Sequence, residues 1–174
     1  MNKNIFFAGH FELSGSTDLP LSERLSGDYR SLVLGSPTKL VNSATDLILP
    51  DGNRYLGPFY CEKASDGTFT STICSEVIGA EYAAVSTCDI IIAVLDRECS
   101  TGTVVEIEWA IQMEKPMIIY YKVNPDSVYD VQSEYWFVIA DVLRRGKNAV
   151  VKKYEKVEDI AQEILSGEYI NLLP

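Results

Sequence analysis

The sequence predicts an α/β fold: a doubly wound, mainly parallel sheet with helices on both faces. Short apolar runs alternate with segments of helical periodicity along the chain. Several of these runs are apolar at every position, which is typical of strands that helices cover on both faces. The 174 residues contain no internal repeat, linker or low-complexity segment. We therefore predict a single domain over residues 1–174.

The first half of the chain carries a weaker pattern than the second. An apolar run at 5–8, closed by Gly9, predicts a first buried strand. Apolar residues at a spacing of four predict a helix over 18–29. Residues 31–66 give little signal beyond an Asp51-Gly52 turn that joins two extended pieces.

The second half predicts a regular alternation of helices and strands. We expect helices at 69–88, 103–114, 133–145 and 156–165, and strands at 89–95, 116–121 and 149–151. The ending at 169–174 is apolar for a terminus, which predicts that it docks on the body of the protein or on a neighbouring subunit.

Charge and composition exclude several classes of function. The formal net charge of -10 disfavours phosphate backbones and anionic lipid surfaces, so we expect neither nucleic acid nor a membrane as partner. No export signal is evident, and the four cysteines show no zinc spacing. We therefore expect a cytoplasmic protein with free thiols and no bound metal. No Walker or GxGxxG pattern supports a dinucleotide cofactor, and we expect no cofactor.

Two acidic side chains, Glu106 and Glu81, lie on the apolar face of their predicted helices. An ionised carboxylate is costly to bury without partners, so each requires an explanation. For Glu106 the plain alternative is a capping box that begins at Thr103. For Glu81 it is a side chain at the rim of the helix, with its head in water.

Candidate binding residues lie where ligands of open parallel sheets bind, beyond the carboxyl ends of the strands. They are Gly9, His10 and Phe11 after the first strand, Asp96 after the 89–95 strand, and Ser100, Gly102 and Thr103 at the start of the Glu106 helix. We expect the positive end of that helix to keep Glu106 ionised. An ionised carboxylate in a partly dry cleft can attack an electrophilic sugar carbon.

Three stretches of the sequence resemble the nucleoside 2-deoxyribosyltransferase family. Residues 5–11 are similar to the opening strand and glycine turn of that family, and Glu81 stands where the family has an acid, usually aspartate. Residues 100–110, followed by Lys115-Pro116, resemble the family block D-S-G-T-x-x-E-x-G-x-A with its later K-P. The resemblance covers about half of the chain and implies a flavodoxin or Rossmann-like sheet, in agreement with the alternation above.

The resemblance also implies roles for these residues. Glu106 is expected to attack C1′ of a nucleoside or nucleotide, which expels the base and leaves a glycosyl-enzyme that passes the sugar to another base. Glu81 is expected to lie near the base and to assist its protonation, while Gly102 and Thr103 are expected to let the backbone approach the sugar. Family members complete one another's sites, so the resemblance implies a homo-oligomer.

Three positions depart from the family pattern. Ser100 stands where aspartate is common, Phe6 where some members have a tyrosine, and Glu108 where the family has glycine. Two further functions therefore stay open beside base exchange. One is a nucleoside or nucleotide N-glycosidase with water as acceptor, and the other is a catalytically silent nucleotide-binding module. A hydrolase built on Cys99, which precedes a helix, and the single His10 is a third alternative.

Overall fold

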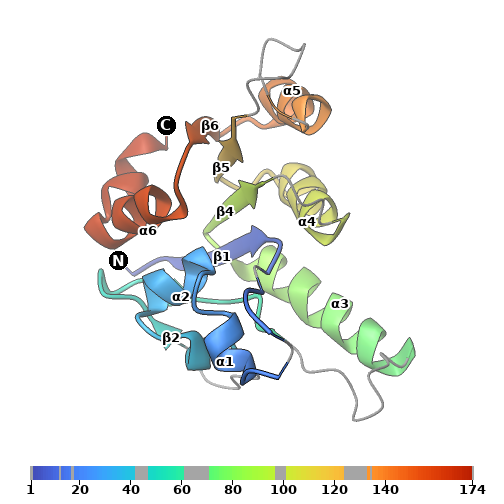
Figure 1. The fold of residues 1–174 in the computed structure, drawn as a ribbon. Helices are drawn as coiled ribbons and strands as arrows, with labels where there is room; N and C mark the ends of the chain where they lie inside the picture. The colour runs from blue at the N-terminus through green and yellow to red at the C-terminus, as the bar shows by residue number, and fades with distance from the viewer. Residues whose placement is uncertain are drawn as a thin grey trace.

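The described part of the chain forms one six-stranded sheet in the order β2-β3-β1-β4-β5-β6 (Figure 1). The structure, a computed structural model, describes residues 2–11, 13–16, 18–41, 47–60, 71–96, 101–123, 133 and 135–173, with side chains from 75 onward in the helix that begins at 71. The strands are β1 (Asn4–Gly9), β2 (Leu47–Ile48), β3 (Arg54–Tyr55), β4 (Ile90–Leu95), β5 (Met117–Lys122) and β6 (Ala149–Tyr154). Only the pairing of β2 with β3 is antiparallel among these strands. The prediction of a mainly parallel sheet is confirmed.

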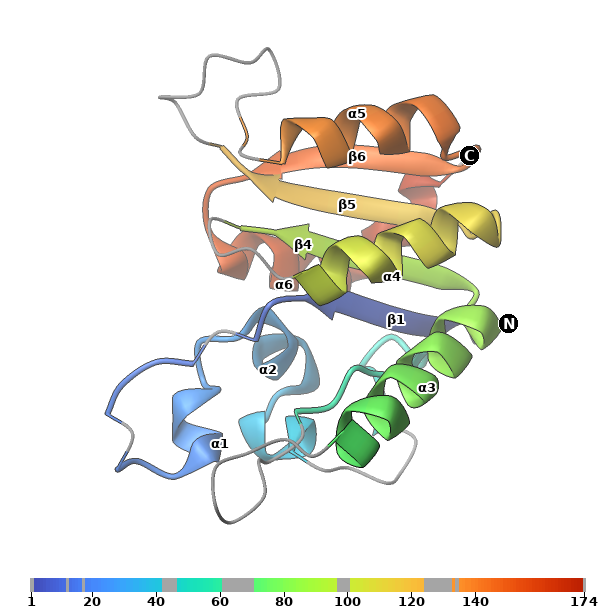
Figure 2. The ribbon, with the colours of Figure 1, turned by 90° about the vertical axis from the view of Figure 1, so that its right-hand side faces the viewer.

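Helices cover both faces of this sheet. They are α1 (Leu21–Arg24), α2 (Tyr29–Leu34), α3 (Ser71–Thr87), α4 (Thr101–Gln112), α5 (Trp136–Arg145) and α6 (Val157–Ser166), with 3-10 turns η1 (Pro37–Leu40) and η2 (Glu168–Leu172). Figure 2 shows α3, α4 and α5 across one face, and α2 and α6 lie on the other (Figure 1). The doubly wound arrangement predicted from the sequence is therefore confirmed.

The two faces of the sheet bury separate hydrophobic cores. Successive residues of a strand point to opposite faces, so Ile5 and Phe7 pack with the α2 and α6 layer, while Phe6 and Ala8 pack with the α3, α4 and α5 layer. In β4 all six side chains are buried. Burial on both faces explains why this strand has a continuous apolar sequence rather than an alternating one.

One predicted element is wrong. Instead of a single helix over 18–29, the chain forms the short α1 and then starts again at α2. Asp28 caps the new helix, because its side chain accepts a hydrogen bond from the backbone amide of Arg30 at 2.9 Å. The apolar spacing was real, since Leu25 and Tyr29 share the core, but the chain turns between them. This interruption brings Arg30 into the interior.

The remaining predicted elements are confirmed with shifts of a few residues at their ends. The Asp51-Gly52 turn connects β2 to β3. The C-terminal segment docks on the body of the chain: Tyr169 is fully buried, and its hydroxyl donates to Asp51 at 2.8 Å. None of the described helices combines the length and apolar character that crossing a bilayer requires.

Candidate active site

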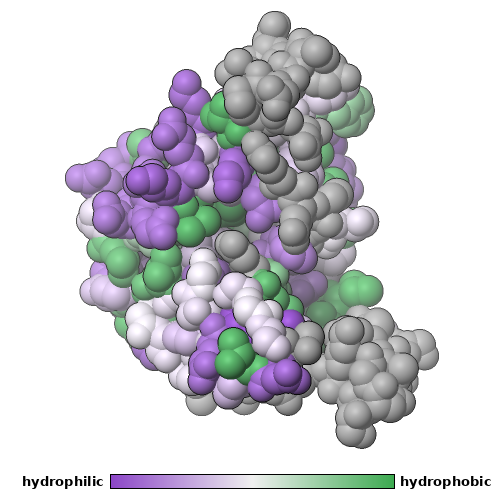
Figure 3. All heavy atoms as spheres, viewed as in Figure 1, coloured by the Kyte–Doolittle hydropathy of each residue, from purple (hydrophilic) through white to green (hydrophobic). Residues whose placement is uncertain are grey.

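The adjacent strands β1 and β4 send the chain to opposite faces of the sheet. After β1 the chain continues to α2 on one face, and α4, which follows β4, lies on the other (Figure 2). The carboxyl ends of two such strands form the crevice in which open α/β sheets bind ligands. Figure 3, which looks onto this edge, shows hydrophobic residues interspersed with hydrophilic ones. The predicted site residues that the structure describes can be located relative to this crevice.

Gly9 ends β1 in a conformation that suits glycine. Its φ is +155°, and a Cβ added there would lie 3.4 Å from both Tyr29 Cε1 and the Val94 carbonyl oxygen. The Tyr29 hydroxyl donates to the carbonyl of Ala8 at 2.9 Å, which holds α2 tightly against the strand end. The glycine therefore permits the close approach of α2 and β4 to β1.

Glu106 lies in α4 and points into the molecule, with only 5% of its surface exposed. Burial and the neighbouring carboxyl group of Glu81 together raise the pKa of its carboxyl group to about 8, while the positive charge of Arg30 acts in the opposite direction. In the free protein at neutral pH, Glu106 is therefore mainly protonated.

Two expectations for Glu106 are corrected by this placement. The helix begins at Thr101, so Thr103 lies inside it and is not the cap of a capping box. Glu106 is also more than one turn into α4, where the field of the helix end has weakened, and it does not stay ionised. Desolvation and the nearby acid outweigh the helix dipole.

Glu81 is half-buried in α3, and burial raises its pKa, with Arg30 again acting in the opposite direction. It borders a hollow of about 320 Å³ between α3 and the β1–β3 edge of the sheet. The lining is mainly apolar: Phe6, Leu56, Pro58, Phe59, Val77, Ala80 and Ala84, with Glu76 beside Glu81. An acid is thus placed at the border of an apolar hollow, where a planar ligand could be covered on its faces.

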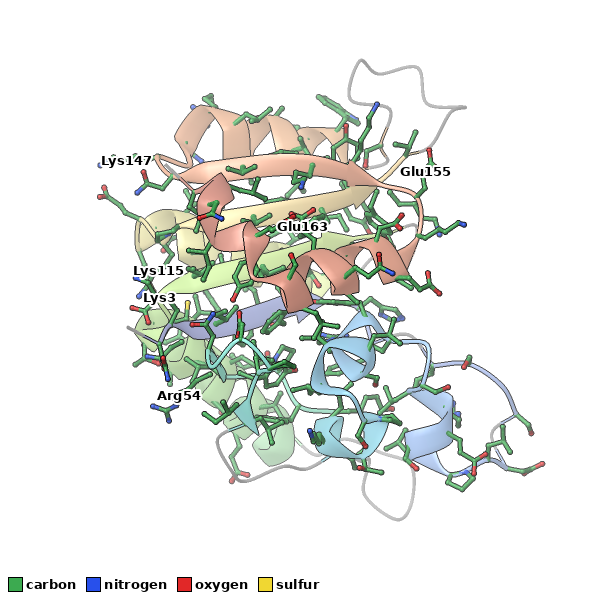
Figure 4. All side chains as sticks on the ribbon, turned by 90° about the vertical axis from the view of Figure 1, so that its left-hand side faces the viewer. Lys3, Arg54, Lys115, Lys147, Glu155 and Glu163 are labelled. Carbon is green, nitrogen blue, oxygen red and sulfur yellow. The ribbon has the colours of Figure 1, made fainter. Side chains whose placement is uncertain are left out.

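Arg30 is a fully buried cation whose charge acts on both carboxyl groups. It forms an ion pair with Asp28 at 2.7 Å, and both side chains are almost completely buried. Burial of the charge opposes its high pKa, but Asp28 keeps the guanidinium protonated. Other basic side chains, such as Lys3, Lys115 and Lys147, lie at the amino ends of the strands (Figure 4). Arg30 therefore supplies positive charge at the opposite edge, where the acids are.

The residues that follow β1 and β4 also reach this edge. Phe11 is half-buried, and its ring lies 3.8 Å from the Arg30 guanidinium carbon and 5.3 Å, edge to face, from the ring of Tyr60. His10 is half-buried, and its carbonyl accepts from Arg30 at 2.9 Å. Asp96 directly follows β4 and is half-buried. Their roles in ligand binding stay predictions.

The predicted residues at the start of α4 have different environments. Thr103 is buried, whereas Gly102 is exposed. Ser100 lies outside the described residues.

Two positions that depart from the family pattern can also be located. Glu108 points outward, because it accepts a hydrogen bond from Gln112 at 3.0 Å and pairs with Arg145. Phe6 is buried beneath the α3 and α4 layer, so the residue that replaces the family tyrosine is a core residue here.

The cysteine alternative has no support in the described residues. Cys99 lies outside them, and Cys88 is a buried free thiol at the amino end of β4, where burial raises its pKa to about 11. Such a thiol is largely protonated and unreactive at neutral pH. Within the described residues, no group of three or more His, Cys, Asp or Glu side chains could hold a metal ion.

The arrangement is suited to proton and glycosyl transfer. The negative charge of Glu81 opposes ionisation of Glu106, so ionisation of both carboxyl groups at the same time is disfavoured. Such a pair holds a nucleophile and an acid in the same site, as glycoside-cleaving enzymes require.

Sequence reasoning missed Asp28 and Arg30. An arginine at this position gives no local sign of burial, because its backbone partners lie in β1 and directly after it, 20 or more residues earlier in the chain. The signal that was available is the Asp-Tyr-Arg order, in which an aspartate can cap a helix and bind an arginine two residues later.

No protein-family model matches this chain, and no curated protein matches it. Among solved structures, the chain is similar to the CMP N-glycosidase BcmB of Clostridium botulinum, at 24% sequence identity and a TM-score of 0.41, over 52% of this chain and 73% of that chain. It is also similar to translation elongation factor SelB of Methanococcus maripaludis in complex with the GTP analogue GPPNHP, at 13% identity and a TM-score of 0.54, over 98% of this chain and 33% of that chain. The second likeness shows the α/β fold alone, and this chain spans only a third of that elongation factor. The functional assignment therefore depends on the chemistry of the site.

Proposed function

We propose that this chain is an enzyme that cleaves the N-glycosidic bond of a nucleoside or nucleotide and passes the sugar to a second base. The observation that carries the proposal is Glu106, a buried carboxyl group of α4 whose ionisation the neighbouring acid Glu81 of α3 opposes. This pairing agrees with the roles that the resemblance to nucleoside 2-deoxyribosyltransferases implies. The chemistry uses carboxyl groups of the chain and needs neither a metal nor a cofactor.

The first step requires the pair to carry one proton. The ionised Glu106 carboxylate attacks C1′, a C1′–O bond forms, and the C1′–N bond breaks with its electron pair passing to the base. The Glu81 carboxyl group gives its proton to the departing base. Because the free protein holds the proton mainly on Glu106, substrate binding must favour its transfer to Glu81.

The second step restores the enzyme. A nitrogen of the incoming base attacks C1′ of the glycosyl-enzyme, the bond to Glu106 breaks, and the proton of the incoming base passes to Glu81. If water attacks instead, the products are free sugar and base. The apolar hollow beside Glu81 supports a base as acceptor, since a planar aromatic ring can occupy it and exclude water.

The test combines products with a trapped intermediate. The protein is incubated with deoxynucleosides, ribonucleosides and their 5′-phosphates, with and without an acceptor base, and the products are separated. A mixed base–sugar product supports base exchange, whereas free sugar assigns the chain as a hydrolase. Mass spectrometry after a substrate pulse should show a sugar adduct on the peptide that contains Glu106.

The matched controls are Glu106→Ala and Glu155→Ala. Glu155 is an exposed glutamate in the loop before α6 (Figure 4). The first variant should lose the adduct and all cleavage, while the second should retain both. Full cleavage by Glu106→Ala would exclude Glu106 as the nucleophile. If the wild type binds a nucleoside tightly but does not cleave it, the chain is a binding module without catalytic activity.

A further inference from the structure

The guanidinium group of Arg30 uses every hydrogen-bond donor that it has. Nε and one terminal nitrogen donate to the two oxygens of Asp28, at 2.8 and 2.7 Å. The remaining donors reach the backbone carbonyls of Phe7, Gly9 and His10, at 3.3, 3.1 and 2.9 Å. Since a guanidinium has five N–H groups, no donor is left for a substrate. Arg30 is therefore not a ligand-binding arginine.

The bonds to the backbone carbonyls take the place of the hydrogen bonds that a neighbouring strand would make with the end of β1. β3 pairs with β1 only at Asn4 and Ile5, so beyond that point no described strand pairs with β1 on this side. The Phe7 amide is satisfied by the Gly57 carbonyl at 2.8 Å, and Arg30 satisfies the carbonyls of Phe7 and Gly9. Buried carbonyl groups need such partners. The end of β1 is thus fixed to α2 by a side chain rather than by the sheet.

The same side chain places a charge close to the carboxyl pair. Two charges act on Glu106, the carboxyl group of Glu81 on α3 and the guanidinium group of Arg30 on α2, and Glu106 in turn raises the pKa of Tyr29 and of Tyr55. His10 and Asp96 are the further titratable groups that follow the ends of β1 and β4. Among these groups Arg30 favours the ionised form of both carboxyl groups.

We propose that Arg30 is a positioning residue for the glycosidic cleavage: its fork holds the end of β1, with His10 and Phe11, in place, and its buried charge favours the carboxylate that attacks. The inference rests on the proposed function. Arg30 acts through Glu106 and the β1 loop and touches no reacting atom. A merely structural ion pair would also stabilise the fold, but it would leave the ionisation of Glu106 unchanged when it is replaced.

Three variants separate the effect of the guanidinium hydrogen bonds from the effect of the positive charge. Arg30→Lys keeps the charge but cannot reach all five acceptors. The double variant Asp28→Asn with Arg30→Met removes the pair together, which avoids an unpaired buried charge. Asp28→Asn alone keeps the arginine and removes the negative charge. Arg144→Met, at an exposed position of α5, controls for the change in net charge.

The first measurement does not depend on activity. Carbon-13 NMR of labelled glutamate carboxyl groups, with Glu106 assigned through Glu106→Gln, follows the pKa of Glu106 in each variant. We expect the pKa of Glu106 to rise in the double variant and to fall in Asp28→Asn. Arg30→Lys and Arg144→Met should leave it close to the wild-type value. Opposite shifts cannot come from loosened packing, which would move both variants in the same direction.

The second measurement follows release of the base. The double variant should lose kcat by about tenfold or more at neutral pH, and Arg30→Lys should mainly raise KM because the loop that carries Phe11 is less fixed. An unchanged Glu106 pKa in a folded double variant would overturn the proposal. If that variant does not fold, an unchanged pKa in Asp28→Asn overturns it equally. If the wild type cleaves no nucleoside while the pKa shifts appear, the proposed function fails and the electrostatic role of Arg30 stands.

Discussion

Glu106 should make the folded protein less stable as the pH rises. Burial and the neighbouring acid raise its pKa from 4.5 to about 8, so the folded state holds a proton that the unfolded state has lost. An acid whose pKa is raised by folding does not destabilise the folded state at a pH below its pKa in the unfolded state. The loss of folding free energy then grows with pH until the pKa of the folded state is passed. We therefore expect the penalty to develop between about pH 4.5 and pH 8.

The size of this loss of stability follows from the difference between the pKa values of Glu106 in the folded and unfolded states. One pH unit corresponds to about 1.4 kcal/mol, so the displacement from 4.5 to about 8 amounts to up to about 5 kcal/mol above pH 8. That is a large share of the stability of an ordinary domain, which is about 5–15 kcal/mol. Glu106→Gln keeps the shape of the protonated acid but cannot ionise. It should therefore be more stable than the wild type by several kcal/mol at alkaline pH and nearly equal to it in mild acid.

The assay is urea unfolding of the wild type and Glu106→Gln at about pH 5, pH 7 and pH 9. The difference between the two proteins isolates Glu106 from all other titrating groups. Glu155→Gln, at an exposed position, should show no growing difference over the same range. The reasoning is refuted if the advantage of Glu106→Gln does not increase with pH, since the carboxylate would then be hydrated or paired.

Three further predictions concern the pair and its surroundings. The pH profile of kcat/KM should be bell-shaped, with its falling limb near pH 8, because the active pair carries one proton; a profile that rises to a plateau above that pH would show that no second acid is needed. Glu81→Gln should lower kcat by about 100-fold with little change in KM, as steady-state kinetics of base release would measure, and unchanged turnover would limit Glu81 to a structural role. Tyr29→Phe removes the hydrogen bond to Ala8 and should lower the free energy of unfolding by about 1 kcal/mol, whereas Tyr82→Phe, at an exposed position, should change it little in the same unfolding experiment.

The local pattern of the sequence determined the sheet, the long helices and the inward direction of one acid. Continuous apolar runs such as β4 are set by burial on both faces, and the helical period alone placed Glu106 on the inner side of α4. These features depend on neighbouring residues along the chain, so they can be read without coordinates.

Only the tertiary structure decided the protonation of Glu106 and the role of Arg30. A pKa depends on the water removed and on the charges brought near, and here these come from α2, α3 and α4, which are distant in sequence. The break between α1 and α2 also depends on distant contacts. The spacing of Leu25 and Tyr29 suits one helix, but Arg30 pairs with Asp28 and donates to carbonyl groups of β1, and these interactions favour a second helix that begins after Asp28. Interactions between segments far apart in the chain leave no periodic trace in the sequence.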